Sequence, residues 1–223
     1  MTRSVEQLVD VDSPTWPQLV EATKSTATTV EVLPVTREQG ERTLHRLQVT
    51  THSALGALAL ECGGLLVDHG WLRILGGGHD GIPDLATANG LDDPSDSSTD
   101  PPHLLVALDV LGGRFAIDGG GLGVATGQVC YFAPDSLQWD SLDIGHTAFV
   151  HAMIGGATER FYDGQRWPGW QEECARLAST EGFALYPPPF TVEGQDLSAV
   201  SRGAVPMDEL LGFYDDAAGQ LSH

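Results

Sequence analysis

Two histidines with aspartate neighbours are the side chains best suited to acid–base chemistry in this chain of 223 residues. Asp68 precedes His69, and Asp80 follows His79. Imidazole titrates near neutral pH, and loops at strand ends often deliver such groups to a site. If the intervening hairpin brings the two histidines together, either imidazole could be the general base of a small-molecule hydrolase. The adjacent aspartates also suit plain turn chemistry, and no HExxH spacing indicates a metal site.

A glycine-rich segment, Gly119 to Gly123, has the composition of a phosphate-binding loop. Closely spaced backbone N–H groups in such a loop can surround an anion. However, a strand-like run beginning near Val129 follows the glycines where a phosphate loop would lead into a helix, and the Walker lysine is missing. We therefore interpret the segment as a flexible loop between two strands.

Nucleophile motifs are absent from the sequence. It contains no GxSxG, and Ser136 lies in a stretch that is typical of a turn. The three cysteines, Cys62, Cys130 and Cys174, have no CxxC spacing and lie among apolar residues. This context predicts buried free thiols in a reducing compartment. We accordingly predict no catalytic residue, no metal and no cofactor.

An aromatic segment at residues 161–170 places tryptophans beside an arginine, a combination found in binding hot spots. The position of Trp170 on a helical face favours a core role for the same segment. The side chains that could contact a partner are the charged and aromatic residues Asp68, His69, His79, Asp80, Trp139, Arg166 and Trp167.

The positions of these candidate residues depend on a sheet that we expect between about residues 53 and 156. Leu104–Leu108 and Gln128–Phe132 are apolar on both faces, as central strands are, whereas Arg114–Asp118 alternates. Leu65–Val67 and Trp71–Leu75 predict a hairpin that joins this sheet.

The sheet is followed by an amphipathic helix with Phe149, Val150, Met153 and Ile154 on one face, ended by Gly155-Gly156.

The N-terminal part predicts two helices and a strand. Ser13 and Pro14 have the pattern of an N-cap followed by proline, and residues 30–34 read as a short strand. Thr36 and Gln39 form a capping-box pattern for a helix that ends near Leu47. Both a helix and a strand fit residues 50–64, and we favour an extended segment.

The C-terminal part, about residues 157–221, is predicted to be mainly helical. Pro168 is expected to begin one helix, Phe183–Tyr186 to form a strand, and Pro206 to begin a last helix with an apolar stripe from Met207 to Leu221. The whole chain then forms a single α+β domain, with helices packed on a mainly antiparallel or mixed sheet and a C-terminal helical extension.

An acidic loop at about residues 88–103 combines aspartate, serine and proline with low hydrophobicity. Such a composition predicts a mobile loop, and the segment lacks the ligand spacing of an EF-hand.

The net charge of −20 is the most unusual property of the composition. It disfavours binding to nucleic acid and anionic membranes and favours encounter with basic partners, although it also suits plain solubility. The sequence has neither 18 consecutive apolar residues nor a secretion signal at its start, so we expect a cytoplasmic protein.

Several motifs closely resemble a bacterial family known only as a domain of unknown function. They include Gly63–Gly76, Asp109–Ile117, Tyr131–Trp139 and Arg166–Trp170, and the match runs from Pro14 to Met207.

A looser pattern covers about residues 63–156 and contains Phe115-Ala116-Ile117-Asp118 and Val129-Cys130-Tyr131-Phe132. It resembles the SUKH superfamily, although residues 76–103 depart from it. That resemblance implies a SUKH-like core and an immunity protein that neutralises a toxin, often a nuclease, and it carries over no catalytic residues.

We therefore expect a non-enzymatic cytoplasmic protein-binding module, whose partner could be a basic toxin. A small-molecule enzyme that uses His69 or His79 is one alternative. An oligomer assembled through the C-terminal helix is another.

Overall fold

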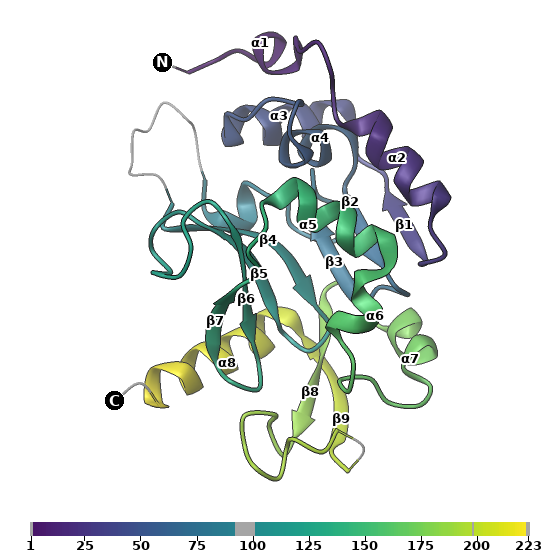
Figure 1. Ribbon diagram of the computed structural model, residues 1–223, viewed down its shortest axis with the longest axis vertical. Coiled ribbons are helices and arrows are strands. Elements are labelled where there is room, and N and C mark those ends of the chain that lie inside the picture. The colour runs from purple at the N-terminus through teal and green to yellow at the C-terminus, as the bar shows by residue number, and fades with distance from the viewer. Residues whose placement is uncertain (1, 92–100, 198, 222–223) are drawn as a thin grey trace.

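Across residues 2–91, 101–197 and 199–221, which the computed structural model describes, one seven-stranded antiparallel sheet forms the centre of the molecule. Its strands follow one another in sequence order, and a separate two-stranded sheet lies beside it (Figure 1). Helices pack around both sheets, so the predicted α+β class is confirmed. The predicted mobile loop falls largely on residues 92–100, which lie outside the described residues.

The central sheet contains β1 (Val30–Leu33), β2 (Gly64–Val67), β3 (Leu72–Leu75), β4 (His103–Asp109), β5 (Arg114–Asp118), β6 (Val129–Ala133) and β7 (Gln138–Ser141). β4 lies in the middle, between β3 and β5, as its apolar sequence predicts. β2 and β3 form the predicted hairpin, with Val67 opposite Leu72 and Gly64 opposite Leu75.

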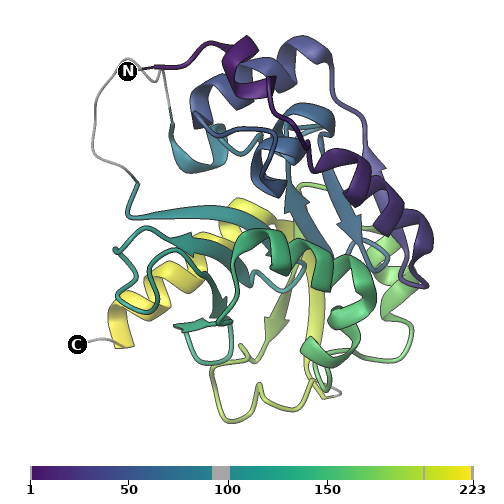
Figure 2. The ribbon, with the colours of Figure 1, turned by 45° about the horizontal axis from the view of Figure 1, so that its top comes forward.

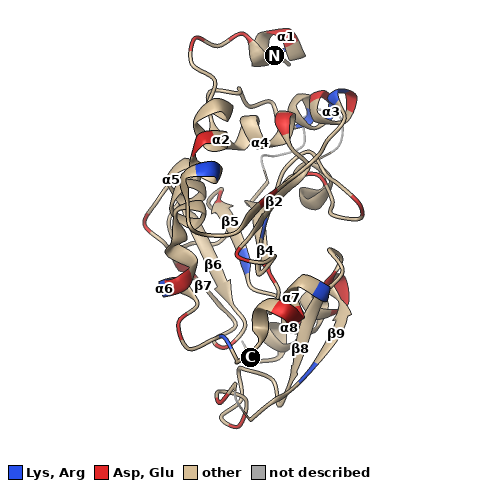
Figure 3. Ribbon diagram, turned by 90° about the vertical axis from the view of Figure 1, so that its right-hand side faces the viewer, with Lys and Arg blue, Asp and Glu red and all other residues tan. Residues whose placement is uncertain are grey.

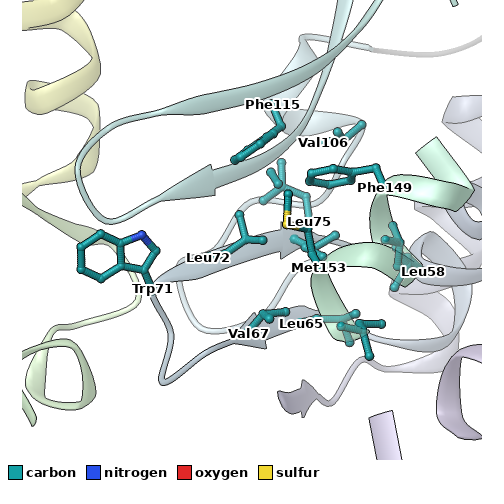
Figure 4. Packing of buried hydrophobic residues seen from close by; sticks show 14 of the residues in the cluster. Leu58, Leu65, Val67, Trp71, Leu72, Leu75, Val106, Phe115, Phe149 and Met153 are labelled. Carbon is teal, nitrogen blue, oxygen red and sulfur yellow. The ribbon is translucent and has the colours of Figure 1, made fainter. Parts of the chain in front are cut away.

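The first face of the sheet carries the main core. Leu65, Ile74, Ala107 and Phe115 are cross-strand neighbours on this face, and all are buried. α2 (Trp16–Ser25), α4 (Ala54–Glu61) and α5 (His146–Ala152) cover it (Figures 1 and 2). Figure 4 shows Phe149 and Met153 from the α5 side reaching the hairpin residues Leu65, Val67, Leu72 and Leu75. Burial of apolar side chains supplies most of the stabilisation here.

The second face is covered by the C-terminal part. α8 (Met207–Leu221) places Leu210 and Tyr214 against Leu108 and Phe132. β8 (Glu181–Tyr186) and β9 (Ser201–Pro206) form the small sheet, which continues from the central one through a hydrogen bond from Phe183 N to Val110 O of 2.7 Å.

The remaining helical elements are α1 (Val5–Val9), α3 (Arg37–Leu47), the 3₁₀ turn η1 (Thr87–Asn89), the π-helical turn η2 (Met153–Ala157), α6 (Thr158–Phe161) and α7 (Trp170–Arg176). α3 begins where predicted, because the Thr36 hydroxyl accepts a hydrogen bond from Gln39 N, and it ends at Leu47 as predicted.

The extended segment expected between residues 50 and 64 is wrong. Residues 54–61 form α4, and Ser53 caps it by accepting a hydrogen bond from Gly56 N. Residues 54–60 are all buried, so this helix has no polar face from which helical periodicity could be read.

Several predicted boundaries are also wrong. α2 begins at Trp16 after Thr15, and α7 begins at Trp170 after Gly169. The helix that contains Phe149 does not stop at the glycine pair, because η2 carries the chain on into α6, with Gly156 at a φ of 99°.

β9 was not expected, and the part from residue 157 to residue 221 is therefore only partly helical. Its residues are mostly exposed and show no apolar alternation, so the pairing with β8 defines the strand.

Candidate functional site

One cross-strand row on the second face of the sheet carries three charged and two aromatic side chains. Cα partners join it from one edge strand to the other: Glu31, Leu66, Arg73, Leu108, Arg114, Phe132 and Trp139. α8 covers the middle of the row, whereas the end formed by β1, β2 and β3 lies beside α7. A cavity lies at the end formed by β1, β2 and β3.

A cavity of about 270 Å³ lies between this end of the sheet and the segment that contains α7. Its lining comes from the strands and their turn on one side and from α7 and its C-terminal extension on the other: Thr29, Glu31, Leu66, His69, Gly70, Arg73, Cys174, Ala175, Leu177 and Ser179. We call it the α7 cavity.

Arg73 is the buried cation of the α7 cavity, with 5% of its surface exposed. Its guanidinium donates to Ser179 O at 2.8 Å and to Ala178 O at 3.4 Å. Burial lowers the pKa of Arg73 to about 10, so the side chain remains charged at neutral pH. Among the residues that the structure describes, no carboxylate lies within 4 Å of this guanidinium. Asp109 and Glu181 favour its charged form from further away, but they do not offset the effect of burial on the pKa.

His69 lies at the rim of the cavity, in the turn between β2 and β3. Its ring meets Trp170 edge to face at 5.7 Å between centroids, and its Nε2 is 3.5 Å from the Thr29 hydroxyl. The preceding Asp68 points into the protein, where it accepts hydrogen bonds from Arg166 at 2.5 Å and Thr158 at 2.8 Å. The adjacent aspartate therefore orients neighbouring elements and is already paired.

His79 lies at the opposite end of the hairpin, so the hairpin does not bring the two histidines together. His69 follows β2 and His79 follows β3, and these strands are antiparallel. Three residue steps at about 3.3 Å each already separate the two ends by roughly 10 Å. His79 instead lies 3.5 Å from the exposed carboxylate of Asp80, whose carbonyl accepts a hydrogen bond from Ser179.

The remaining partner candidates are dispersed. Trp139 lies on β7, at the far edge of the sheet, where Arg114 stacks over it at 5.7 Å. Arg166 stacks on Trp170 at 4.2 Å, and Trp167 is only 3% exposed. The aromatic segment is thus largely core, which is the role that the position of Trp170 favoured.

The glycine-rich loop surrounds a carboxylate of its own chain. Asp118, at the end of β5, accepts hydrogen bonds from the backbone N–H groups of Gly120, Leu122, Val124 and Ala125 at 2.7 to 3.3 Å. Burial would raise the pKa of Asp118, but these four donors together lower it. An aspartate directly before the glycine run was the sequence signal for this arrangement.

A second internal carboxylate, Asp109, was not recognised in the sequence. It accepts hydrogen bonds from Tyr131 Oη at 2.8 Å and from the backbone of Leu111 and Gly113. Burial raises its pKa despite these bonds. Asp109 holds the β4–β5 turn in place, and it is fully buried.

A wider groove of about 580 Å³ lies where β8 and β9 meet α8, and we call it the C-terminal groove. Tyr186 and Phe213, which line it, are 75% and 46% exposed. Glu209 and Arg202 also line it, and Arg202 is paired with Glu173 at 3.7 Å. Asp216 shares a face of α8 with Glu209 and Phe213 by helical spacing, so acidic groups flank an apolar centre.

The described ranges carry neither a metal-ligand cluster nor a membrane-spanning helix. These residues contain no group of three or more His, Cys, Asp or Glu side chains that could hold a metal ion. Within the same ranges, no helix is both long enough and apolar enough to span a bilayer. The three cysteines are free and buried, as predicted.

Comparison with known proteins places the chain among bacterial sequences. A family model described as "Protein of unknown function DUF2625" matches residues 5–210. "Putative uncharacterized protein YbfG" of Escherichia coli (strain K12) is 40% identical over 190 residues, which cover 83% of this chain and 84% of that protein. An "Uncharacterized protein" of Haemophilus influenzae is 35% identical over 186 residues, covering 83% and 82%. No solved structure matches the chain.

Proposed function

The chain belongs to the DUF2625 family of proteins of unknown function, and we propose that it is a non-enzymatic, cytoplasmic protein that binds a basic protein partner. The resemblance of residues 63–156 to the SUKH superfamily supports a narrower version of this proposal. In that version the partner is a toxin, and binding neutralises it.

The C-terminal groove is the observation that carries the proposal. Tyr186 and Phe213 expose large aromatic surfaces on either side of it, and exposed aromatic side chains are frequent binding anchors. Glu209 and Asp216 flank Phe213 along α8. An apolar anchor with lysine or arginine on either side would match this arrangement in both shape and charge.

The charge of the whole molecule supports a basic occupant over a second copy of the chain. Six arginines are already paired with carboxylates: Arg37, Arg42, Arg46, Arg114, Arg166 and Arg202. Acidic positions are distributed along the whole molecule (Figure 3). With a net charge of −20, two copies repel each other, whereas a basic partner is attracted from a distance.

A small-molecule enzyme that uses His69 or His79 remains the alternative, without support from a converging pair of histidines. His69 and His79 lie at opposite ends of the hairpin, and Asp68 is engaged by Arg166. Assembly through α8 remains a second outcome, which the mass of the protein in solution would reveal.

Affinity capture with three immobilised proteins tests the proposal. These are the wild type, the groove variant Tyr186→Ser/Phe213→Ser, and the control Val124→Ser, which changes an apolar residue 41% exposed on the glycine loop. We expect a basic protein to be retained by the wild type and the control, and released as NaCl rises from about 50 to 500 mM. The groove variant should retain at least about tenfold less of this protein, because truncation of a hot-spot side chain commonly costs about 2 kcal/mol or more of binding free energy.

Capture of the same proteins in equal amounts by all three forms would overturn the proposal, as would retention that is insensitive to salt. For the narrower version, the captured partner should arrest growth when produced alone, and co-production of this protein should relieve the arrest. If the captured partner does not arrest growth, the toxin-neutralising version is wrong, and the proposal that this protein binds a basic partner stands.

A further inference from the structure

We propose that the α7 cavity is a binding site for a small organic monocarboxylate, with the guanidinium of Arg73 as its anchoring cation. This site is separate from the C-terminal groove and does not depend on the partner proposed above. The proposal rests on the lack of a carboxylate in contact with Arg73 among the described residues, on the residues that line the cavity, and on the negative charge of Glu31 in the same cross-strand row.

Arg73 differs from the other arginines that are substantially covered. Each of those has a carboxylate within 4 Å, in the pairs Arg46–Asp84, Arg114–Asp215, Arg166–Asp68 and Arg202–Glu173. Arg73 is more deeply buried than any of them, yet within the described ranges it meets only carbonyl oxygens. A buried charge without a contacting counter-ion is costly, and the more distant carboxylates of Asp109 and Glu181 do not offset the burial of Arg73. An anionic ligand in the adjoining cavity would compensate the charge.

The donors of Arg73 are incompletely used. A guanidinium offers five N–H groups in one plane, and its terminal nitrogens donate once each to Ser179 O and Ala178 O. Its Nε has no acceptor among the described residues. The three remaining N–H groups are suited to the planar, two-oxygen geometry of a carboxylate.

The rest of the lining defines the kind of molecule that would follow the carboxylate. His69, Thr29 and Ser179 can supply further hydrogen bonds, whereas Leu66 and Leu177 give an apolar wall. A volume of 270 Å³ corresponds to about nine water molecules at roughly 30 Å³ each, so the ligand has about ten non-hydrogen atoms or fewer.

Glu31 determines the charge that the cavity tolerates. It lies in the same cross-strand row as Arg73, with Leu66 between them, so the two backbones are about 10 Å apart. A carboxylate at that distance repels a multiply charged anion such as phosphate more strongly than a monoanion. The cavity therefore favours a single carboxylate with an apolar body.

Heteronuclear NMR of the full chain with three probes tests this site. Benzoate is the carboxylate, benzamide is its neutral counterpart of the same shape, and inorganic phosphate is the competing anion. We expect saturable shifts from benzoate at Leu66, His69, Arg73 and Ala175. Benzamide and phosphate should bind at least about tenfold more weakly, because the charge-assisted hydrogen bonds are lost or opposed.

Variants separate the cavity from the rest of the surface. Arg73→Met should weaken benzoate binding at least about tenfold, while Arg176→Met, an exposed arginine on the same helix as the cavity wall, should leave it unchanged. The groove variant Tyr186→Ser/Phe213→Ser should also bind benzoate normally, so the two proposals fail independently.

The wild-type measurement decides the matter even if Arg73→Met does not fold. Equal binding of benzoate and benzamide would overturn the proposal, and so would shifts that cluster at the C-terminal groove. Phosphate binding as tight as that of benzoate would overturn the assignment to a monocarboxylate.

Discussion

Asp118 and Asp109 are both carboxylates inside the protein that accept backbone hydrogen bonds, yet their pKa values move in opposite directions. For Asp118, burial raises the pKa but four backbone donors outweigh it. For Asp109, burial raises the pKa and is not outweighed by Tyr131, Gly113 and Leu111. The balance between desolvation and donors therefore decides the sign at each residue.

We expect Asp118→Asn to destabilise the protein most at neutral pH. The asparagine amide would place an N–H donor against the N–H groups of Val124 and Ala125, from which the carboxylate now accepts hydrogen bonds. Since the pKa of Asp118 is lowered on folding, its stabilisation is present above the unfolded value of about 3.9 and is lost as pH falls through the folded value. Urea unfolding of variant and wild type between about pH 3 and 7 measures the difference.

Asp109→Asn provides the comparison of opposite sign. Because the pKa of Asp109 is raised on folding, ionisation costs the wild type stability as pH rises above about 3.9. The asparagine variant escapes that cost, so its stability relative to wild type should increase with pH. Parallel pH dependences in the two variants would contradict the roles assigned to both residues.

At the scale of elements, a glycine permits the close approach of α3 and α4. A Cβ added to Gly40 in α3 would lie 2.2 Å from Leu60 O in α4, far inside contact distance. The same residue weakens α3 when judged from helix propensity alone. Packing against a fully buried helix therefore explains a glycine that the sequence presents as a defect.

Gly40→Ala should consequently destabilise the protein, by about 1–3 kcal/mol, although alanine favours helix formation. Gly212→Ala is the matched control, because Gly212 lies within α8 with no atom within 4 Å of an added Cβ. The control should be stabilised by about 0.5–1 kcal/mol. Denaturant unfolding gives both values, and stabilisation by Gly40→Ala would show that α3 and α4 are further apart than described.

At the scale of the whole molecule, the excess of acidic residues acts against compactness. The acidic residues behind the net charge of −20 are distributed along the whole molecule, and like charges repel more strongly when they are brought together by folding (Figure 3). Burial of apolar side chains on both faces of the central sheet must offset this repulsion.

Thermal unfolding should therefore shift upward by a few degrees as ionic strength rises from about 10 to 300 mM, because salt screens charges beyond the Debye length. NaCl and KCl should act alike, since screening depends on ionic strength. A midpoint that falls with salt, or that depends on the identity of the cation, would contradict this explanation.

The sequence by itself determined the centre of the main sheet, the hairpin beside it and one capped helix. Residues 104–108 were placed at the centre of a mainly antiparallel or mixed sheet, the Leu65–Leu75 hairpin was joined to it, and the helix from Thr36 to Leu47 was predicted from its N-cap. These features follow from local periodicity and capping, which neighbouring residues specify. The resemblance to a bacterial family was likewise confirmed, by a match over residues 5–210.

Only the tertiary structure decided where distant segments meet. The antiparallel hairpin separates His69 from His79, and α7 closes a cavity over Arg73, which sequence patterns did not single out. α4 and β9 gave no periodic signal, since one is buried on every side and the other is largely exposed. Burial and long-range pairing depend on residues far apart in the chain, and for that reason local patterns could not specify them.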